Sequence, residues 1–116
     1  MKLIMHILKK NEKLNIDNRK VEFGKISNKL LEECTEVMVA IDKYIENKTL
    51  NNLKEIIRET FDVIQMCILI LWRCKIKSET LDEPNLISEI NLEHKDKLIS
   101  ERAWIPETGI LIDIKE

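Results

Sequence analysis

Two acidic pairs, each set within an apolar helical pattern, are the strongest constraint on how this chain folds. One pair is Glu33 with Glu36, and the other is Glu59 with Asp62. Residues three apart lie on one face of an α-helix. At about 100° per residue, the first acid of each pair falls inside an apolar arc and the second lies at its edge. The arcs consist of Leu30, Val37, Ala40, Ile41 and Tyr44 in the first helix and Ile56, Val63, Met66 and Ile70 in the second.

Carboxylates that point toward a common core need a partner or a proton to offset their negative charge. An isolated buried charge costs a large free energy, and neighbouring like charges raise each other's pKa. Such acids are therefore protonated, hold cations or line a wet cleft. An all-oxygen donor set favours a hard divalent cation, Mg²⁺ first and Mn²⁺ second. The alternative is two amphipathic helices whose acids border a solvated face. We favour the metal site because Glu33 and Glu59 occupy equivalent places in their arcs.

Length and composition favour one all-α domain over residues 1–116. A chain of 116 residues buries a modest core alone and a better one as an oligomer. Two Gly and two Pro leave little material for turns, which favours long helices. The net charge is −2 with both signs mixed, so a basic patch for nucleic acid or a membrane surface is not expected.

A cytoplasmic location is expected. The residues Met1 to Lys10 run from apolar to basic, the reverse of a signal peptide, and the apolar run 63–72 is about half a membrane span. The three cysteines have no C-x-x-C spacing and indicate a reduced protein without disulfides, with buried thiols rather than a catalytic one.

Three helices are predicted, at about residues 27–46, 51–75 and 83–102. The expected boundary residues are Ser27 as the first N-cap, Asn47 as a left-handed C-terminal residue, Asn51 or Asn52 as the second N-cap, and Asp82 as the third. Asn52 with Glu55 resembles a capping box. Residues 1–7 suit either a strand or a helix start, residues 11–20 a connection, and residues 110–114 a short extended tail.

The stretch from Phe61 to Trp72 predicts an oligomer. It is apolar on nearly all sides, interrupted by Gln65. A helix that is apolar all round needs neighbours all round. Three helices of a short chain hardly supply them, so we expect a homodimer or a larger homo-oligomer.

The acidic residues also resemble a family signature. Glu32-Glu33-x-x-Glu36, a gap and then Glu59-x-x-Asp62 is similar to the motif of the MazG-like all-α nucleoside triphosphate pyrophosphohydrolases. The resemblance covers about residues 25–75, with a weaker echo at 94–104. It implies an antiparallel helical bundle completed by dimerisation. It also implies Mg²⁺-dependent hydrolysis of a nucleoside triphosphate to the monophosphate and pyrophosphate, in nucleotide-pool house-cleaning.

On this interpretation Glu33, Glu36, Glu59 and Asp62 bind one to three Mg²⁺ ions. The metals would activate water for attack on a phosphoryl group and neutralise the charge that develops. Glu32, Glu33 and Glu36 are the predicted catalytic residues. Glu32 lies one residue off the shared face, where it suits a base, a support for the metal ligands or an ordinary solvated acid.

Triphosphate requires cations in addition to metal, and four are predicted to contact phosphate: Lys29, Arg73, Lys97 and Arg102. Lys29 precedes Glu33 by four residues, so an ordinary ion pair with Glu33 is the interpretation we favour for it. Lys97 and Arg102 lie in the stretch that echoes the family, and a solvated basic face explains them equally well.

Two alternatives to this enzyme differ from it in metal or in activity. A di-iron carboxylate bundle needs Glu-x-x-His on two helices, but Asn91 and Leu3 stand three residues before His94 and His6. A non-catalytic helical module that uses the acidic cleft for interaction or nucleotide binding remains open. The preferred nucleobase is open as well. His94, on the apolar stripe of the third helix, is expected to be a core histidine.

Overall fold

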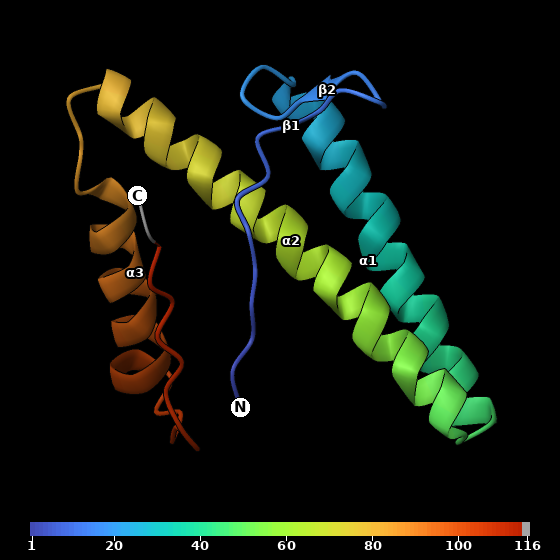
Figure 1. Cartoon of the computed structure of the whole chain (residues 1–116). Coiled ribbons are helices and arrows are strands. Elements are labelled where there is room, and N and C mark those ends of the chain that lie inside the picture. The colour runs from blue at the N-terminus through green and yellow to red at the C-terminus, as the bar shows by residue number, and fades with distance from the viewer. Residues whose placement is uncertain (115–116) are drawn as a thin grey trace. The chain divides into compact units, whose positions relative to one another are not determined.

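The computed structural model describes residues 1–114, and these are mainly helical, which confirms the all-α class (Figure 1). The elements are strands β1 (Lys10–Asn11) and β2 (Ile16–Asp17), helices α1 (Phe23–Glu46), α2 (Leu50–Thr80) and α3 (Leu86–Asp96), and the π-helical segment η1 (Lys97–Glu101). The chain divides into two units, Met1–Lys77 and Ser78–Glu116, with the boundary inside α2. Among residues 1–114, no helix combines the length and apolar character that crossing a membrane requires.

Helix α1 begins at Phe23, before the predicted start at Ser27, and ends at Glu46 as predicted. Gly24 lies in this added turn and disfavours a helix. A glycine costs only about 1 kcal/mol, and the added turn buries Ile26, whose amide donates to the Glu22 carbonyl at 3.2 Å. The left-handed prediction for Asn47 is wrong. Asn47 is extended, with φ −143° and ψ 99°.

Helix α2 is capped by Thr49, not by Asn51 or Asn52. The Thr49 hydroxyl accepts the Asn52 amide at 3.1 Å, which is the usual N-cap contact. The Asn52 side chain instead donates to the Asn47 carbonyl at 2.8 Å and so ties the connection to α1. The helix continues past the predicted end at residue 75 to Thr80, because neither Gly nor Pro interrupts the chain before Pro84.

The unit Ser78–Glu116 holds the third helix, which is shorter than predicted. Its N-cap is Asn85, and the expected cap Asp82 has a left-handed φ of 59°, a conformation that Asp tolerates. His94 is exposed, so the expected core histidine is not seen. Described residues beyond Arg102 form no helix or strand. Apolar side chains of this tail, such as Ile110 and Leu111, are exposed.

In the unit Met1–Lys77, α1 and α2 run antiparallel and side by side (Figure 1). Ile26 and Ala40 of α1 and Leu69 of α2 are its buried apolar residues. Residues 1–7 form neither a strand nor a helix, so both expectations for them are wrong. The stretch 11–20 was predicted as a connection. Most of it belongs to a short hairpin, in which Lys10 pairs with Asp17 and Asn11 with Ile16.

The N-terminal segment is tied to α2 by polar contacts over a long sequence separation. Arg73 donates from Nη1 to the carbonyls of Asn18 at 2.9 Å and Val21 at 2.6 Å. Its guanidinium lies 5.0 Å from the centre of the Phe23 ring. Gln65 donates to the His6 carbonyl at 2.7 Å. The N-terminal segment therefore packs against part of the apolar stretch from Phe61 to Trp72, so the same chain supplies one of the neighbours that this stretch needs.

Each long helix nevertheless keeps an exposed apolar stripe with a seven-residue repeat. The α1 stripe is Leu31, Met38 and Ile45, and the α2 stripe is Leu50, Ile57, Ile64 and Leu71. Leu31 and Met38 stand two residues before the buried Glu33 and Ala40, about 160° away around the helix axis. A seven-residue apolar repeat is typical of a helix that packs against another helix. These two stripes are the exposed apolar side chains of the unit that have this repeat.

Replacing Arg73 with Ala is expected to destabilise the fold by about 2–4 kcal/mol. It removes two charge-assisted hydrogen bonds and a cation–π contact, and it leaves two carbonyls without their donor. Urea unfolding measures the effect. Arg102→Ala, an exposed arginine outside these contacts, is the control and should stay within about 0.5 kcal/mol of wild type. Equal stability of Arg73→Ala and wild type would show that the N-terminal segment is held otherwise.

Candidate functional site

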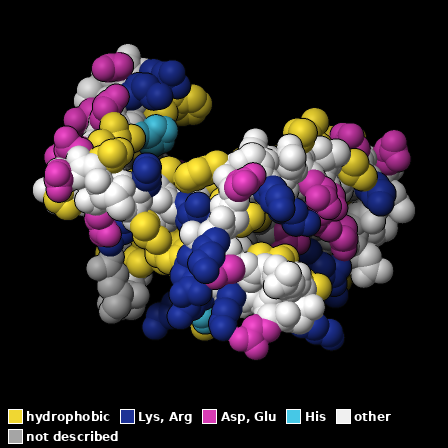
Figure 2. All heavy atoms as spheres, turned by 90° about the horizontal axis from the view of Figure 1, so that it is seen from above, with side chains coloured by type: hydrophobic (Ala, Val, Ile, Leu, Met, Phe, Trp, Pro, Cys, Tyr) yellow, Lys and Arg dark blue, Asp and Glu magenta, His cyan; other side chains and the backbone are white. Residues whose placement is uncertain are grey.

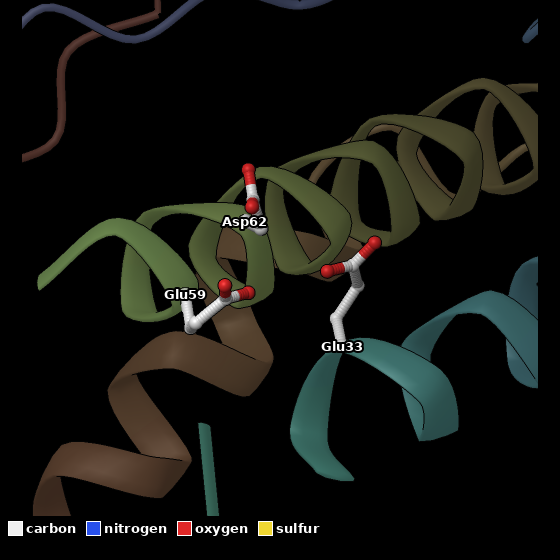
Figure 3. A group of neighbouring side chains, drawn as sticks. All are labelled: Glu33, Glu59 and Asp62. Atoms are coloured by element: carbon white, nitrogen blue, oxygen red, sulfur yellow. The ribbon is translucent and has the colours of Figure 1, made fainter. Parts of the chain in front are cut away.

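Three of the four predicted carboxylates meet between α1 and α2. Glu33, Glu59 and Asp62 each contribute an oxygen, and these oxygens lie within 4.8 Å of one another. Glu33 extends from α1 toward α2, while Glu59 and Asp62 project from successive turns of α2 (Figure 3). Glu33 is 7% exposed, Glu59 is half-buried and Asp62 is exposed. The group is therefore anchored in the core and open to solvent on one side.

The fourth predicted carboxylate, Glu36, lies beside Glu59 rather than within the group of three. A hydrogen bond with Glu55, burial and a hydrogen bond with Glu36 together raise the pKa of Glu59 to about 7. We call Glu33, Glu36, Glu55, Glu59 and Asp62 the acidic cluster.

The sequence interpretation missed Glu55, which it assigned to a capping box. Glu55 precedes Glu59 by four residues and so lies on the same face of α2. That spacing was the available signal. Arg58 holds Glu55 at 2.9 Å and is the main reason that the pKa of Glu55 lies below its usual value.

Lys29 brings a positive charge to the edge of the acidic cluster. Its Nζ lies 2.9 Å from Glu33 and 3.4 Å from Glu32, so the favoured ion-pair interpretation is confirmed. The hydrogen bond to Glu33 raises the pKa of Lys29. Glu32 is exposed and turned to Lys29, and it does not belong to the group of three. A catalytic role for Glu32 stays a prediction.

Arg73, Lys97 and Arg102 were also predicted to contact phosphate. Arg73 holds the segment before α1 against α2, a role that its position in the sequence did not suggest. Lys97 and Arg102 belong to the second unit and are exposed. Phosphate binding by these three residues stays a prediction.

The chain matches no model of a known protein family, no curated protein and no solved structure.

In EDTA, the protonation of Glu59 is expected to make stability depend on pH. The native state keeps this proton up to about pH 7, whereas the ordinary pKa is 4.5. Between these values the native state binds more protons than the unfolded state, so the unfolding free energy falls as pH rises. The stabilising contribution is complete below pH 4.5 and lost near pH 7.

Urea unfolding of wild type and Glu59→Gln across this pH range measures the effect. The stability of wild type should decline relative to Glu59→Gln as the pH rises. Asp42→Asn, an exposed acid of α1 outside the acidic cluster, should follow wild type. Parallel curves for wild type and Glu59→Gln would contradict the raised pKa.

Proposed function

We propose that the protein is a Mg²⁺-dependent nucleoside triphosphate pyrophosphohydrolase. It would convert an NTP or dNTP and water into the monophosphate and pyrophosphate, and serve nucleotide-pool house-cleaning in the cytoplasm. The observation that carries the proposal is the convergence of Glu33, Glu59 and Asp62 from two antiparallel helices. These are positions of the motif that resembles the MazG-like enzymes. The free state of all three cysteines is consistent with a reducing compartment.

The donor chemistry supports a divalent cation at the acidic cluster. The group of three offers oxygen ligands alone, which suit Mg²⁺ and Mn²⁺. The raised pKa of Glu59 means that the crowded carboxylates retain a proton near neutral pH when no cation is present. A divalent cation supplies the same compensation and releases that proton on binding. Glu33, Glu59 and Asp62 would hold the ion, with Glu36 beside them.

Bound Mg²⁺ would supply activation of water and neutralisation of charge on the phosphate oxygens. The side chains would supply a proton acceptor and hold a metal ligand in place. Glu36 is exposed beside Glu59 and is placed to accept a proton from the attacking water. Lys29 pairs with the buried Glu33 at 2.9 Å and would restrain its carboxylate. Cleavage between the α- and β-phosphates is what the family resemblance implies.

We also propose a homodimer. The exposed stripes of α1 and α2 have the seven-residue repeat of helix–helix seams. Ile57 and Ile64 stand two residues away from Glu59 and Asp62, so the α2 stripe turns away from the acidic cluster, as the α1 stripe does. Pairing of subunits through these stripes would leave the acidic cluster accessible to substrate.

One observation favours the non-catalytic alternative. Lys29 already neutralises the buried Glu33 at 2.9 Å without any metal. A helical module that binds nucleotides or a partner through the acidic cluster would need no metal ion in addition to this ion pair. Turnover separates the two functions.

Pyrophosphate release from a panel of NTPs and dNTPs tests the proposal. Release is expected with Mg²⁺ and should stop in EDTA. Asp62→Asn should lower turnover by more than about 100-fold, because losing a direct ligand costs at least as much as losing an outer-shell contact. It should also abolish the rise in Tm that Mg²⁺ gives wild type. Asp42→Asn is the matched control. Release of orthophosphate and diphosphate, or release that persists in EDTA, would contradict the proposal.

The dimer is tested by a charge in the α2 stripe. Wild type should elute as a dimer at micromolar concentration. Ile64→Glu should dissociate it or cause aggregation, because an unpaired charge in an apolar interface is costly. Asn51→Glu, which adds the same charge outside the stripe, should remain dimeric. Light scattering after size exclusion measures the mass, and a wild-type monomer would refute the interface.

A further inference from the structure

A pocket of about 760 Å³ lies between the N-terminal hairpin, the start of α1 and the middle of α2. We call it the hairpin pocket. Every residue that lines it belongs to the unit Met1–Lys77. Its volume falls in the range of small-molecule sites, about 300–1,000 Å³. Its wall includes apolar side chains, among them Ile16, Val21 and Met66.

The hairpin pocket is positively charged. Its lining includes Lys10, Lys20, Lys25 and Lys29, against Asp17 as the one acid of the lining. Arg19 neutralises Asp17 through two side-chain hydrogen bonds, at 3.0 and 2.9 Å, and the side-chain hydrogen bonding with Arg19 is the main reason that the pKa of Asp17 is lowered to about 2. Figure 2 shows Lys and Arg side chains (dark blue) gathered at the hairpin end of the first unit, beside hydrophobic ones (yellow).

Two of these lysines form no close ion pair with a carboxylate among residues 1–114. Lys10 pairs with Glu12 at 2.7 Å and Lys29 with Glu33 at 2.9 Å. Within residues 1–114, neither Lys20 nor Lys25 forms an ion pair. Lys20 is close enough to Asp17 to help lower its pKa, but Arg19 is the direct partner of that carboxylate. Ammonium groups that line a pocket without a direct ion pair remain able to bind an anion.

The hairpin pocket adjoins the acidic cluster along both helices. On α1, Lys25, Lys29 and Glu33 follow one another at four-residue intervals, on one face and about 6 Å apart along the axis. On α2, Met66 lines the pocket one turn after Asp62. Lys29 belongs to both places, since it lines the pocket and pairs with Glu33. An elongated anion can therefore reach from the acidic cluster into the pocket.

We propose that the hairpin pocket binds the nucleotide substrate, with Lys20, Lys25 and Lys29 as contacts for its polyphosphate chain and the apolar wall as the surface for its nucleoside. This inference rests on the proposed function, which it extends by naming the side chains that hold the substrate. A nucleotide combines the two features that the lining offers, several negative charges and an uncharged end with apolar surface. The Asn15 side chain, which forms no hydrogen bond among residues 1–114, adds an amide for polar recognition.

Calorimetric titration of the full chain in EDTA tests the pocket separately from turnover. The probes are ATP, GTP, CTP, UTP and inorganic tripolyphosphate. At least one nucleotide should bind wild type more tightly than tripolyphosphate, and the binding should weaken as NaCl is added. Lys20→Gln and Lys25→Gln should each raise the Kd about 10-fold, the loss of one charge-assisted contact. Lys25→Glu should raise it further.

Lys13→Gln is the matched control. Lys13 lies in the same hairpin, is exposed and does not line the pocket, so its substitution should leave the Kd unchanged. Thermal melting confirms that each variant is folded. No binding by wild type, unchanged Kd in both lysine variants, or tripolyphosphate binding as tightly as every nucleotide would each overturn the proposal.

Failure of the pocket and failure of the proposed function give different results. If pyrophosphate release depends on Mg²⁺ and Asp62 but the lysine variants bind like wild type, the pocket is refuted and the hydrolase stands. If no nucleotide is hydrolysed but affinity in EDTA falls for Lys20→Gln and Lys25→Gln alone, the pocket is supported and the hydrolase is not.

Discussion

Repulsion among carboxylates between α1 and α2 is the constraint on which the organisation of the first unit depends. Two antiparallel helices that pack closely should bury apolar side chains along their seam, yet Glu33 is buried there and Glu59 is half-buried. Two compensations are visible. Lys29 pairs with Glu33, and neighbouring acids hold a proton on Glu59. In the proposed function, a divalent cation would replace the proton and an anion would compete for the lysine. Carboxylates that are crowded together in this way lower the stability of the fold, and acids with strongly shifted pKa values are typical of functional sites.

The helix seam and its acids could be predicted from the sequence because they depend on local spacing. Three-residue intervals inside apolar arcs placed Glu33, Glu59 and Asp62 on facing surfaces, and the structure brings these residues together. Helix ends were less predictable because competing caps differ by small free energies. Thr49 was preferred over two asparagines because its hydroxyl reaches the Asn52 amide, while the Asn52 side chain serves the preceding connection.

The N-terminal segment could not be predicted, because long-range contacts determine its position. Arg73 stands more than fifty residues after the carbonyls that it holds, and Gln65 is equally far from His6. Nothing in local periodicity indicates such contacts. The same limit applies to the hairpin pocket. Lys20 and Lys25 belong to an unremarkable polar stretch of the sequence, and they acquire a common environment only when the hairpin folds against α1 and α2.

The charge of the side chains changes sign along α1, from the hairpin pocket to the acidic cluster. Lys25 and Lys29 precede Glu33 and Glu36 on neighbouring turns, so the pocket favours anions and the acidic cluster favours cations. In the proposed function, a metal-bound polyphosphate would carry both kinds of charge, with the anion extending away from the cation. It would match this order in one orientation and be repelled in the other. The exposed stripes lie on the far side of each helix, so a partner subunit that packs there would stiffen α1 and α2 without neutralising the hairpin pocket or the acidic cluster.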